Sequence, residues 1–150
     1  MDKDVNEVDG ACHCGGVRFR VKLADGLRSA RRCTCSYCRM RGAVAVTARV
    51  GELEVTQGQD LLATYTFNTG VAQHHFCTRC GIYTHHRRRS NPDEYGVNAA
   101  CLGVSPFDFE EVLVTDGVNH PCDVGPGRSG VVGVLRFIPA AQMAEDADRR

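Results

Sequence analysis

The stretch Cys12-His13-Cys14-Gly15-Gly16 places two cysteines one residue apart, directly before two glycines. A second stretch much further along the chain, Cys77-Thr78-Arg79-Cys80-Gly81, again puts a glycine after a pair of cysteines. A glycine at this point lets the backbone turn tightly and direct its amides at the sulfurs. Two such turns supply the four thiolates that a tetrahedral zinc ion requires. We therefore predict one structural zinc ion that holds the fold together. Its predicted ligands are Cys12, Cys14, Cys77 and Cys80.

A third group of cysteines, Cys33-Thr34-Cys35-Ser36-Tyr37-Cys38, lies between the first two. Two closed tetrahedral sites need eight thiolates, but the three groups together hold seven. The simplest division gives the middle group a zinc ion with three protein ligands and an open fourth position, which is the usual arrangement at catalytic zinc. We predict that this second zinc carries the chemistry. Its predicted ligands are Cys33, Cys35 and Cys38.

Other divisions of the cysteines stay open at this point. The pairs Cys35–Cys38 and Cys77–Cys80 could form a zinc ribbon, although residues 39–76 separate them and ribbons usually have about 15–20 residues between pairs. A histidine, Cys101 or Cys122 could close the second site, and the thiols could instead form disulfides. We expect Cys101 to be a core thiol because its surroundings are apolar, and Cys122 to be exposed.

The compartment follows from the cysteine count and the first residues. Nine cysteines would leave one unpaired in a disulfide framework. Met1–Gly10 is acidic and polar, without the features of a signal peptide. The longest apolar stretches, such as Gly42–Ala48 and Gly130–Leu135, are too short to cross a bilayer. We expect a soluble, cytoplasmic protein with no membrane partner. Thiols stay reduced there, which favours metal ligation over disulfides.

The charges of the chain balance, with 18 basic and 18 acidic side chains. A balanced total gives no general attraction for nucleic acid, although basic clusters at Arg28–Arg41 and Arg87–Arg89 leave a local patch open. We expect Arg87–Arg89 to form an exposed turn. The sequence does not indicate an oligomeric state.

The remaining pattern predicts short strands. In Val17–Val21 three apolar residues alternate with two arginines, which is strand periodicity. Glycine, asparagine, aspartate and proline separate the segments, so we predict one all-β domain over residues 1–150 with little helix. One helical turn is expected at Ser36–Arg41, a helix or frayed tail at Pro139–Arg149 and a loop at His120–Gly130. The other predicted strands are Ala43–Ala48, Leu62–Phe67, Gln73–Phe76, Ile82–His86, Val97–Leu102, Val112–Thr115 and Val132–Ile138.

The order of the motifs over residues 8–115 resembles that of one family, the glutathione-dependent formaldehyde-activating enzymes, also known as the centromere protein V domain. The motifs that carry the resemblance are Gly10-Ala11-Cys12-His13-Cys14-Gly15-Gly16-Val17-Arg18-Phe19, Cys33-Thr34-Cys35-Ser36-Tyr37-Cys38-Arg39, Phe76-Cys77-Thr78-Arg79-Cys80-Gly81 and Val97-Asn98-Ala99-Ala100-Cys101-Leu102.

This resemblance implies a β-tent of small antiparallel sheets around a structural zinc. It also implies two zinc ions per chain, with the same division of cysteines that counting suggests. The implied activity is that of a carbon–sulfur lyase, which forms or cleaves S-hydroxymethylglutathione from formaldehyde and glutathione. The implied partner is a small thiol, and fold alone does not establish this activity.

Charged and titratable residues flank the cysteine groups. Four arginines near the middle group could bind substrate carboxylates, or could be solvated surface residues: Arg31, Arg32, Arg39 and Arg41. Four histidines flank the third group, and we expect them to be strand residues beside the structural zinc: His74, His75, His85 and His86. One of them could serve as a proton shuttle or ligand.

Three functions therefore compete. The first is an enzyme that holds a thiol at the second zinc, where the metal would keep it as a thiolate for attack on a small carbonyl. The second is a non-catalytic zinc module that binds protein or nucleic acid. The third is a zinc or redox sensor whose three-cysteine site loses metal on oxidation. We favour the enzyme.

Overall fold

The structure of the chain is a computed structural model that describes residues 5–119 and 130–147. Ten strands in this part of the chain form one strongly bent sheet. The strands are β1 (Glu7–Ala11), β2 (Arg18–Leu23), β3 (Arg31–Cys33), β4 (Ala45–Gln57), β5 (Leu62–Tyr65), β6 (Gln73–Cys77), β7 (Tyr83–Arg87), β8 (Glu94–Asn98), β9 (Val112–Thr115) and β10 (Val131–Leu135). The helices are α1 (Ser36–Arg41) and α3 (Ala140–Ala147), with 3-10 turns η1 (Gln59–Leu61), η2 (Ala99–Leu102) and η3 (Pro106–Asp108).

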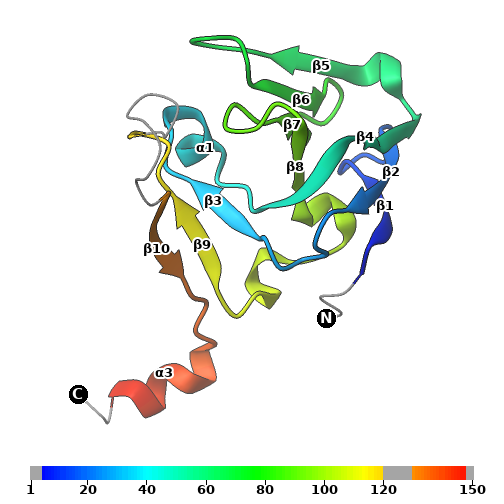
Figure 1. Ribbon diagram of the computed structural model, residues 1–150. Coiled ribbons are helices and arrows are strands. Elements are labelled where there is room, and N and C mark those ends of the chain that lie inside the picture. Colours follow the sequence, from blue (N-terminus) through cyan, green and yellow to red (C-terminus); the bar gives the residue numbers. More distant parts are fainter. Residues whose placement is uncertain (1–4, 120–129, 148–150) are drawn as a thin grey trace.

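The long strand β4 connects the parts of the sheet. The strand order is β10-β9-β3-β4-β8-β7-β6-β5, and β2 also pairs with β4 and carries β1 on its other side. The first half of β4 pairs with β8, and most of its pairs with β2 lie after Gly51. Gly51 has a φ of +97°, which side chains disfavour, so glycine permits the change of direction there. Figure 1 shows β5–β8 and β1–β2 lying on different sides of β4.

The core lies between these parts and follows from the alternation in β2. Phe19, Val21 and Leu23 are buried, while the intervening Arg20 and Lys22 are exposed. This confirms the strand predicted from the period-two pattern. The largest buried cluster adds apolar residues from β4, β8, η2 and β9, among others Val46, Ala48, Val97, Cys101, Leu102 and Val112.

The prediction of a mostly β fold with little helix is confirmed. All strand pairs among the described residues are antiparallel except β3 with β9, which run parallel. The predicted turn at Ser36–Arg41 is α1, and the C-terminal helix forms as α3, with Pro139 directly before its first residue. No helix within the described ranges is both long and apolar enough to cross a membrane.

Some predictions of secondary structure differ from the structure, and one falls on residues that it does not describe. The strand predicted at Val97–Leu102 ends at Asn98, whose side chain accepts a hydrogen bond from the Ala100 amide and so starts the turn η2. Strands β1 and β3 were not predicted, because β1 contains two acidic residues and a glycine and β3 has only three residues. The predicted loop at His120–Gly130, with Cys122, lies outside the described residues up to position 129.

Candidate functional site

Two turns of the same kind present the cysteines of the first and third groups. In the first, the Cys12 amide donates to the Val17 carbonyl at 3.1 Å, and in the other the Cys77 amide donates to the Ile82 carbonyl at 3.0 Å. Gly15 and Gly81 have φ of +74° and +77°. Glycine is needed at both places because the chain reverses there in the left-handed conformation. Each turn therefore presents its two thiols on one side of the turn.

The four sulfurs of these turns lie within 4.8 Å of one another. The Cys14 sulfur is 3.6 Å from that of Cys12 and 3.8 Å from that of Cys77. These separations fit ligands at the corners of a tetrahedron with about 2.3 Å to its centre, whose corners are about 3.8 Å apart. They are far too long for disulfides, and the eight described cysteines are free. The donor set and spacing therefore fit a zinc ion, and that the ion is zinc stays a prediction.

The thiols of this group compete for negative charge. Burial acts to raise the pKa of Cys12, but the Val17 amide and the thiols of Cys14 and Cys77 outweigh it and lower that pKa. For Cys14 the Gly16 amide acts in the lowering direction, but burial and the other thiols raise the pKa to about 11. Such opposed shifts mean that the cluster holds several thiolates poorly by itself. A bound cation removes this conflict.

The middle group forms a second cluster at the start of α1. The sulfurs of Cys33, Cys35 and Cys38 also lie within 4.8 Å of one another, and all three residues are partly buried. Backbone amides donate to two of them, from Cys35 to the Cys33 sulfur at 3.4 Å and from Cys38 to the Cys35 sulfur at 3.3 Å. Hydrogen bonds from its two neighbours lower the pKa of Cys35, whereas its neighbours raise that of Cys38.

A glycine from the other end of the chain makes room for this cluster. The Gly117 amide donates to the Thr34 hydroxyl at 3.0 Å. A Cβ atom at Gly117 would lie 2.4 Å from the Cys33 sulfur and 2.7 Å from the Cys35 backbone nitrogen. Only glycine fits against the cysteine turn at this distance. The local sequence carries no signal for this role of Gly117, because its partner Thr34 lies 83 positions away.

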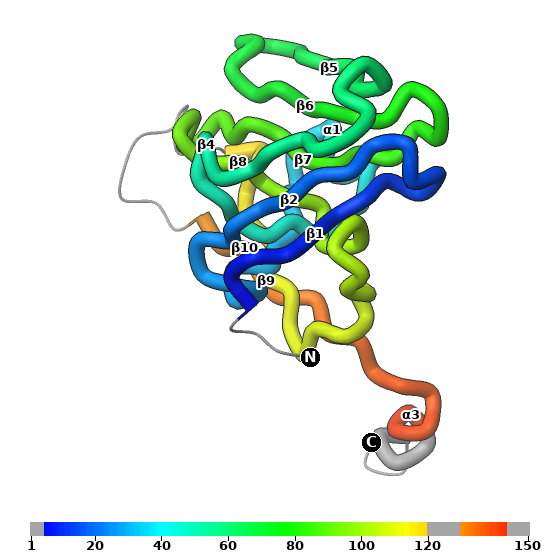
Figure 2. The backbone as a smooth tube through the Cα atoms, turned by 90° about the vertical axis from the view of Figure 1, so that its right-hand side faces the viewer, coloured from blue at the N-terminus to red at the C-terminus, as the bar shows by residue number. Residues whose placement is uncertain are grey.

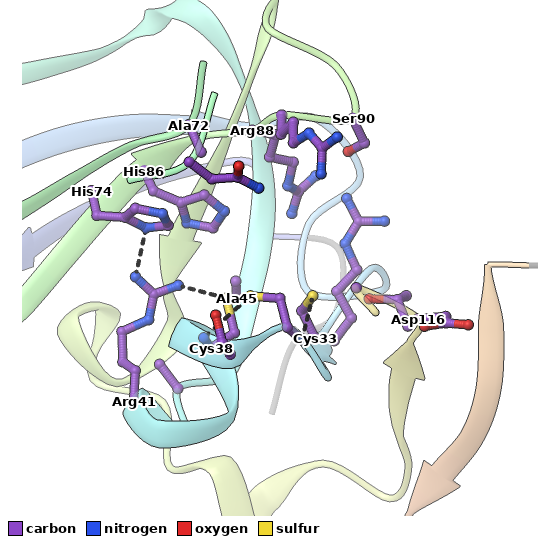
Figure 3. A pocket seen from close by; sticks show the side chains of 18 of the residues that line it. Cys33, Cys38, Arg41, Ala45, Ala72, His74, His86, Arg88, Ser90 and Asp116 are labelled. Atoms are coloured by element: carbon purple, nitrogen blue, oxygen red, sulfur yellow. Dashed lines mark hydrogen bonds between the residues drawn. The ribbon is translucent and has the colours of Figure 1, made fainter. Parts of the chain in front are cut away.

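The second cluster opens onto a cavity of about 340 Å³, whereas the four-cysteine group does not line it. The cavity is rich in cationic and titratable side chains (Figure 3). Its lining includes Cys33, Cys35, Cys38, His74, His86, Arg31, Arg41, Arg88, Arg89 and Asp116. Three predicted ligands therefore sit at the wall of a space large enough for a small molecule.

The arginines of the cavity are only partly those that the sequence suggested. Arg31 and Arg41 line it, while Arg32 and Arg39 are not among its lining residues. The prediction of an exposed turn at Arg87–Arg89 is wrong, because Arg87 ends β7, Arg87 and Arg89 are half-buried, and Arg88 is buried. Arg88 donates to the Thr47 hydroxyl at 2.8 Å and to Glu94 at 3.1 Å, and its Nη2 has no hydrogen-bond partner among the described residues. Burial lowers its pKa, and the charge of Arg31 adds to this effect.

The histidines are strand residues as expected, but two of them face the second cluster. Residues of β6 and β7 pair so that His74 lies opposite His86, and His75 opposite His85. Alternation along the strands places one pair on each face of the sheet. His74 and His86 line the cavity, and His75 and His85 do not. The sequence contains a signal for this division, because adjacent histidines on a strand point to opposite faces of the sheet.

Arg41 connects the cluster to the histidines. Its Nη2 donates to the Cys38 sulfur at 3.3 Å and its Nη1 lies 2.9 Å from His74 Nδ1. The guanidinium also stacks on the ring of Tyr83, with Cζ 3.7 Å from the ring centroid. These contacts hold one fixed cation between a thiol, an imidazole and a phenol. Figure 3 shows the two hydrogen bonds that Arg41 makes.

The chain is similar to proteins of known sequence and structure. A protein from Halomonas elongata, assigned by name to the glutathione-dependent formaldehyde-activating enzymes, is 34% identical over 82 residues, which cover 49% of this chain and 51% of that protein. The chain thus spans about half the length of this curated relative. A crystal structure of a Rhodobacter sphaeroides protein is 56% identical, with a TM-score of 0.70, and the match covers 71% of this chain and 99% of that one.

The family model "Glutathione-dependent formaldehyde-activating enzyme" matches residues 7–111. This range contains both cysteine clusters and both cavity histidines. It ends before Gly117 and the last two strands. The chain therefore belongs to the family of glutathione-dependent formaldehyde-activating enzymes.

Proposed function

We propose that the chain is a zinc-dependent carbon–sulfur lyase or synthase that acts on a thiol adduct such as S-hydroxymethylglutathione. The observation that carries the proposal is the contrast between the two cysteine clusters. Four thiols form a compact group away from the cavity, whereas Cys33, Cys35 and Cys38 meet at its wall. Three protein ligands beside a cavity are typical of a catalytic zinc, and four are typical of a structural one.

A zinc ion bound at the three cysteines would lower the pKa of an incoming thiol, so that the thiol binds as a thiolate near neutral pH. Three thiolates give the site a negative charge, and Arg41 reduces it through its hydrogen bond to Cys38. In synthesis, the substrate sulfur forms a bond to the carbonyl carbon of formaldehyde, the π electrons move to oxygen, and oxygen takes up a proton. Cleavage is the reverse.

The cationic wall of the cavity supports a thiol that carries a carboxylate. Arg88 is held in place by Thr47 and Glu94, and its Nη2 remains without a partner in the described part of the chain. Arginine suits carboxylates because its parallel N–H groups match the two oxygens. Glutathione has two carboxylates, so the lining fits the substrate that the family name suggests.

The same proposal includes two zinc ions per chain, one domain over residues 1–150, and a cytoplasmic location, where reduced glutathione is abundant and thiols stay reduced.

Burial of Arg88 argues against a continuous exposed basic run at Arg87–Arg89, which weakens the case for a nucleic-acid module. We therefore favour catalysis over binding.

The first experiment measures formation of S-hydroxymethylglutathione from ¹³C-formaldehyde and glutathione by NMR, together with zinc content before and after a mild chelator. We expect about two zinc ions, of which one is removed easily and is retained better with glutathione. Cys35→Ser should abolish the activity and this zinc. Cys101→Ser is the matched control, because Cys101 is buried outside both clusters and should leave both unchanged.

Other outcomes point to the competing functions. Zinc release by peroxide, without any acceleration of the reaction, would indicate a redox sensor. Two zinc ions that resist the chelator and ignore glutathione, together with salt-dependent binding to RNA or DNA, would indicate a binding module.

A further inference from the structure

Two stacked histidines face the cavity beside the three-cysteine cluster. His74 and His86 come from the neighbouring strands β6 and β7, and their rings stack with centroids 5.1 Å apart. In Figure 3 the two rings lie next to each other, and Arg41 bridges from His74 toward Cys38. We call His74 and His86 the cavity histidine pair. Their hydrogen bonds define which nitrogen of each ring carries the proton.

His74 presents a proton donor. Arginine has N–H donors and no acceptor, so Arg41 Nη1 must donate to His74 Nδ1, which lies 2.9 Å away. The neutral ring then carries its proton on Nε2. Burial, followed by the charge of Arg41, lowers the pKa of His74 to about 4, so the ring is neutral at pH 7. Nε2 is buried and has no hydrogen-bond partner among the described residues.

His86 presents the opposite arrangement. The Tyr83 hydroxyl lies 3.1 Å from the Gly96 carbonyl oxygen and 2.5 Å from His86 Nδ1. The carbonyl can only accept, so the hydroxyl donates to it and accepts from Nδ1–H. Nε2 is left with a free lone pair. If the Tyr83 hydroxyl instead donated to His86 Nδ1, its oxygen and the Gly96 carbonyl oxygen would face each other with no proton between them. Burial lowers the pKa of His86 well below its usual value, so this ring is neutral too.

The cavity histidine pair therefore combines one donor and one acceptor beside the thiol cluster. We propose that His86 Nε2 transfers the proton of the reaction while His74 Nε2–H donates a hydrogen bond to the substrate oxygen. The inference rests on the proposed function and names the residues that move its proton. Neither role requires a metal-bound water or any additional reactant.

In synthesis, the proton and electron movements return both histidines to their starting state. His86 Nε2 takes the proton of the incoming thiol, which leaves a thiolate and an imidazolium. The C–S bond then forms, and the π electrons of the carbonyl move to oxygen, where the Nε2–H group of His74 stabilises the developing charge. The imidazolium of His86 gives its proton to this oxygen, so thiol and aldehyde become the hemithioacetal and both histidines are restored. Cleavage reverses each step.

Arg41 and Tyr83 are positioning residues in this scheme. Arg41 fixes the tautomer of His74 and Tyr83 fixes that of His86. The two are in contact, since the Arg41 guanidinium lies 3.7 Å from the Tyr83 ring centroid. Gly96 completes the arrangement, because a Cβ atom there would lie 2.3 Å from Cε1 of the His86 ring. The pair is thus supported from α1, β7 and β8.

The kinetic test uses the second histidine pair as its control. His86→Gln keeps the approximate size but cannot carry a proton, so kcat/KM for S-hydroxymethylglutathione cleavage should fall about 10²–10⁴-fold. His74→Phe removes the donor and should cost about 10²–10³-fold, while His74→Gln, which retains an N–H at this point, should recover part of the loss. His75→Gln lies on the same strand outside the cavity and should keep wild-type kinetics.

A structural test does not depend on activity. Long-range ¹H–¹⁵N NMR spectra of the zinc-loaded protein distinguish the two tautomers of each ring. We expect Nε2–H for His74 and Nδ1–H for His86, and we expect Tyr83→Phe to weaken the preference of His86. The same tautomer in both rings, or the reverse assignment, would overturn the proton-transfer pair.

The outcomes separate the two proposals. An active wild type with His86→Gln as fast as His75→Gln overturns the histidine roles and leaves the lyase function intact. A wild type that does not accelerate the reaction at all overturns the lyase function and the histidine roles with it. Loss of activity in His86→Gln, partial recovery in His74→Gln and the expected tautomers together support the inference.

Discussion

Gly117 shows how one residue without a side chain controls a metal cluster. A Cβ atom at this position would overlap the Cys33 sulfur and the Cys35 backbone, and the second of these cannot move aside cheaply. We predict that Gly117→Ala shifts the cysteine turn at a cost of about 1–3 kcal/mol and weakens zinc binding at this cluster at least about tenfold. Competition with a coloured chelator measures the affinity. Gly133→Ala is the control, because nothing lies within 4 Å of a Cβ there. Equal zinc affinity in both variants would contradict the packing argument.

Arg88 should determine which thiols bind. Its buried guanidinium lines the cavity and retains an unpartnered Nη2 among the described residues. A charged hydrogen bond contributes about 1.5–3 kcal/mol, so Arg88→Met should raise the KM for glutathione about 10- to 100-fold. The KM for 2-mercaptoethanol, which has no carboxylate, should change much less.

The ratio of the two KM values controls for general damage to the fold, since loss of the contacts to Thr47 and Glu94 affects both thiols alike. Arg79→Met, at an exposed arginine beside the other cysteine cluster, should leave the ratio unchanged. An equal rise of both KM values would rule out carboxylate recognition by Arg88.

The residues of the site could be predicted from the sequence only where the signal is local. The spacing of cysteines and glycines is a local pattern, and the structure brings together the same two groups that counting suggests. Gly117 and Arg88 act through contacts with residues far away, and Gly117 meets Thr34 across 83 positions. The burial of Arg88 depends on β4 and β8 covering it, which a run of three arginines does not reveal.

At the scale of elements, the two glycine turns join distant strands. One turn connects β1 to β2 and the other connects β6 to β7. Cys77 is fully buried in the small cluster with Cys12 and Val17. Zinc at this point would hold the two hairpins against each other, and structural zinc in small domains contributes about 10–16 kcal/mol.

We therefore predict different outcomes for the two clusters. Cys77→Ser should fail to fold, because the zinc contribution is as large as the whole stability of a typical domain, about 5–15 kcal/mol. Cys35→Ser should fold and lose only one zinc ion. Circular dichroism and zinc analysis of the purified variants distinguish the cases. A stable, soluble Cys77→Ser protein would refute the structural role, and an unfolded Cys35→Ser protein would show that both clusters are structural.

Elements with a clear period were predictable, and short or mixed ones were not. The alternation in β2 and the turn at Ser36–Arg41 were identified because each segment contains its own signal. Strand β3 forms through pairing with β9, which lies about 80 residues later in the chain, so its three residues carry no signal alone. The sequence also could not show that α3 extends away from the sheet, as Figures 1 and 2 show.

At the scale of the whole molecule, the sheet buries neutral histidines. His85 is buried on the face opposite the cavity, packed against Phe19, His75 and Tyr95. Burial, with a smaller contribution from the charge of His75, lowers its pKa to about 3. An unfolded histidine has a pKa of about 6.5. The folded state therefore excludes a proton that the unfolded state binds.

The sign of the resulting pH dependence follows from this difference. Above pH 6.5 neither state binds the proton, and the contribution of His85 to stability is complete. As the pH falls from 6.5 toward 3, only the unfolded state becomes protonated, so stability falls by about 1.4 kcal/mol per pH unit for this residue. Zinc release at low pH would add to the effect, because thiolates must become protonated.

Urea unfolding of wild type and His85→Asn between pH 7 and 5 separates the contribution of His85 from that of zinc release. We expect both proteins to lose zinc alike, so that the difference between their slopes reports His85, whose Nδ1 bond to Thr84 an asparagine can replace. We expect the variant to have the shallower slope. Identical slopes would mean that the folded state admits the proton and that the sheet opens around His85 in acid.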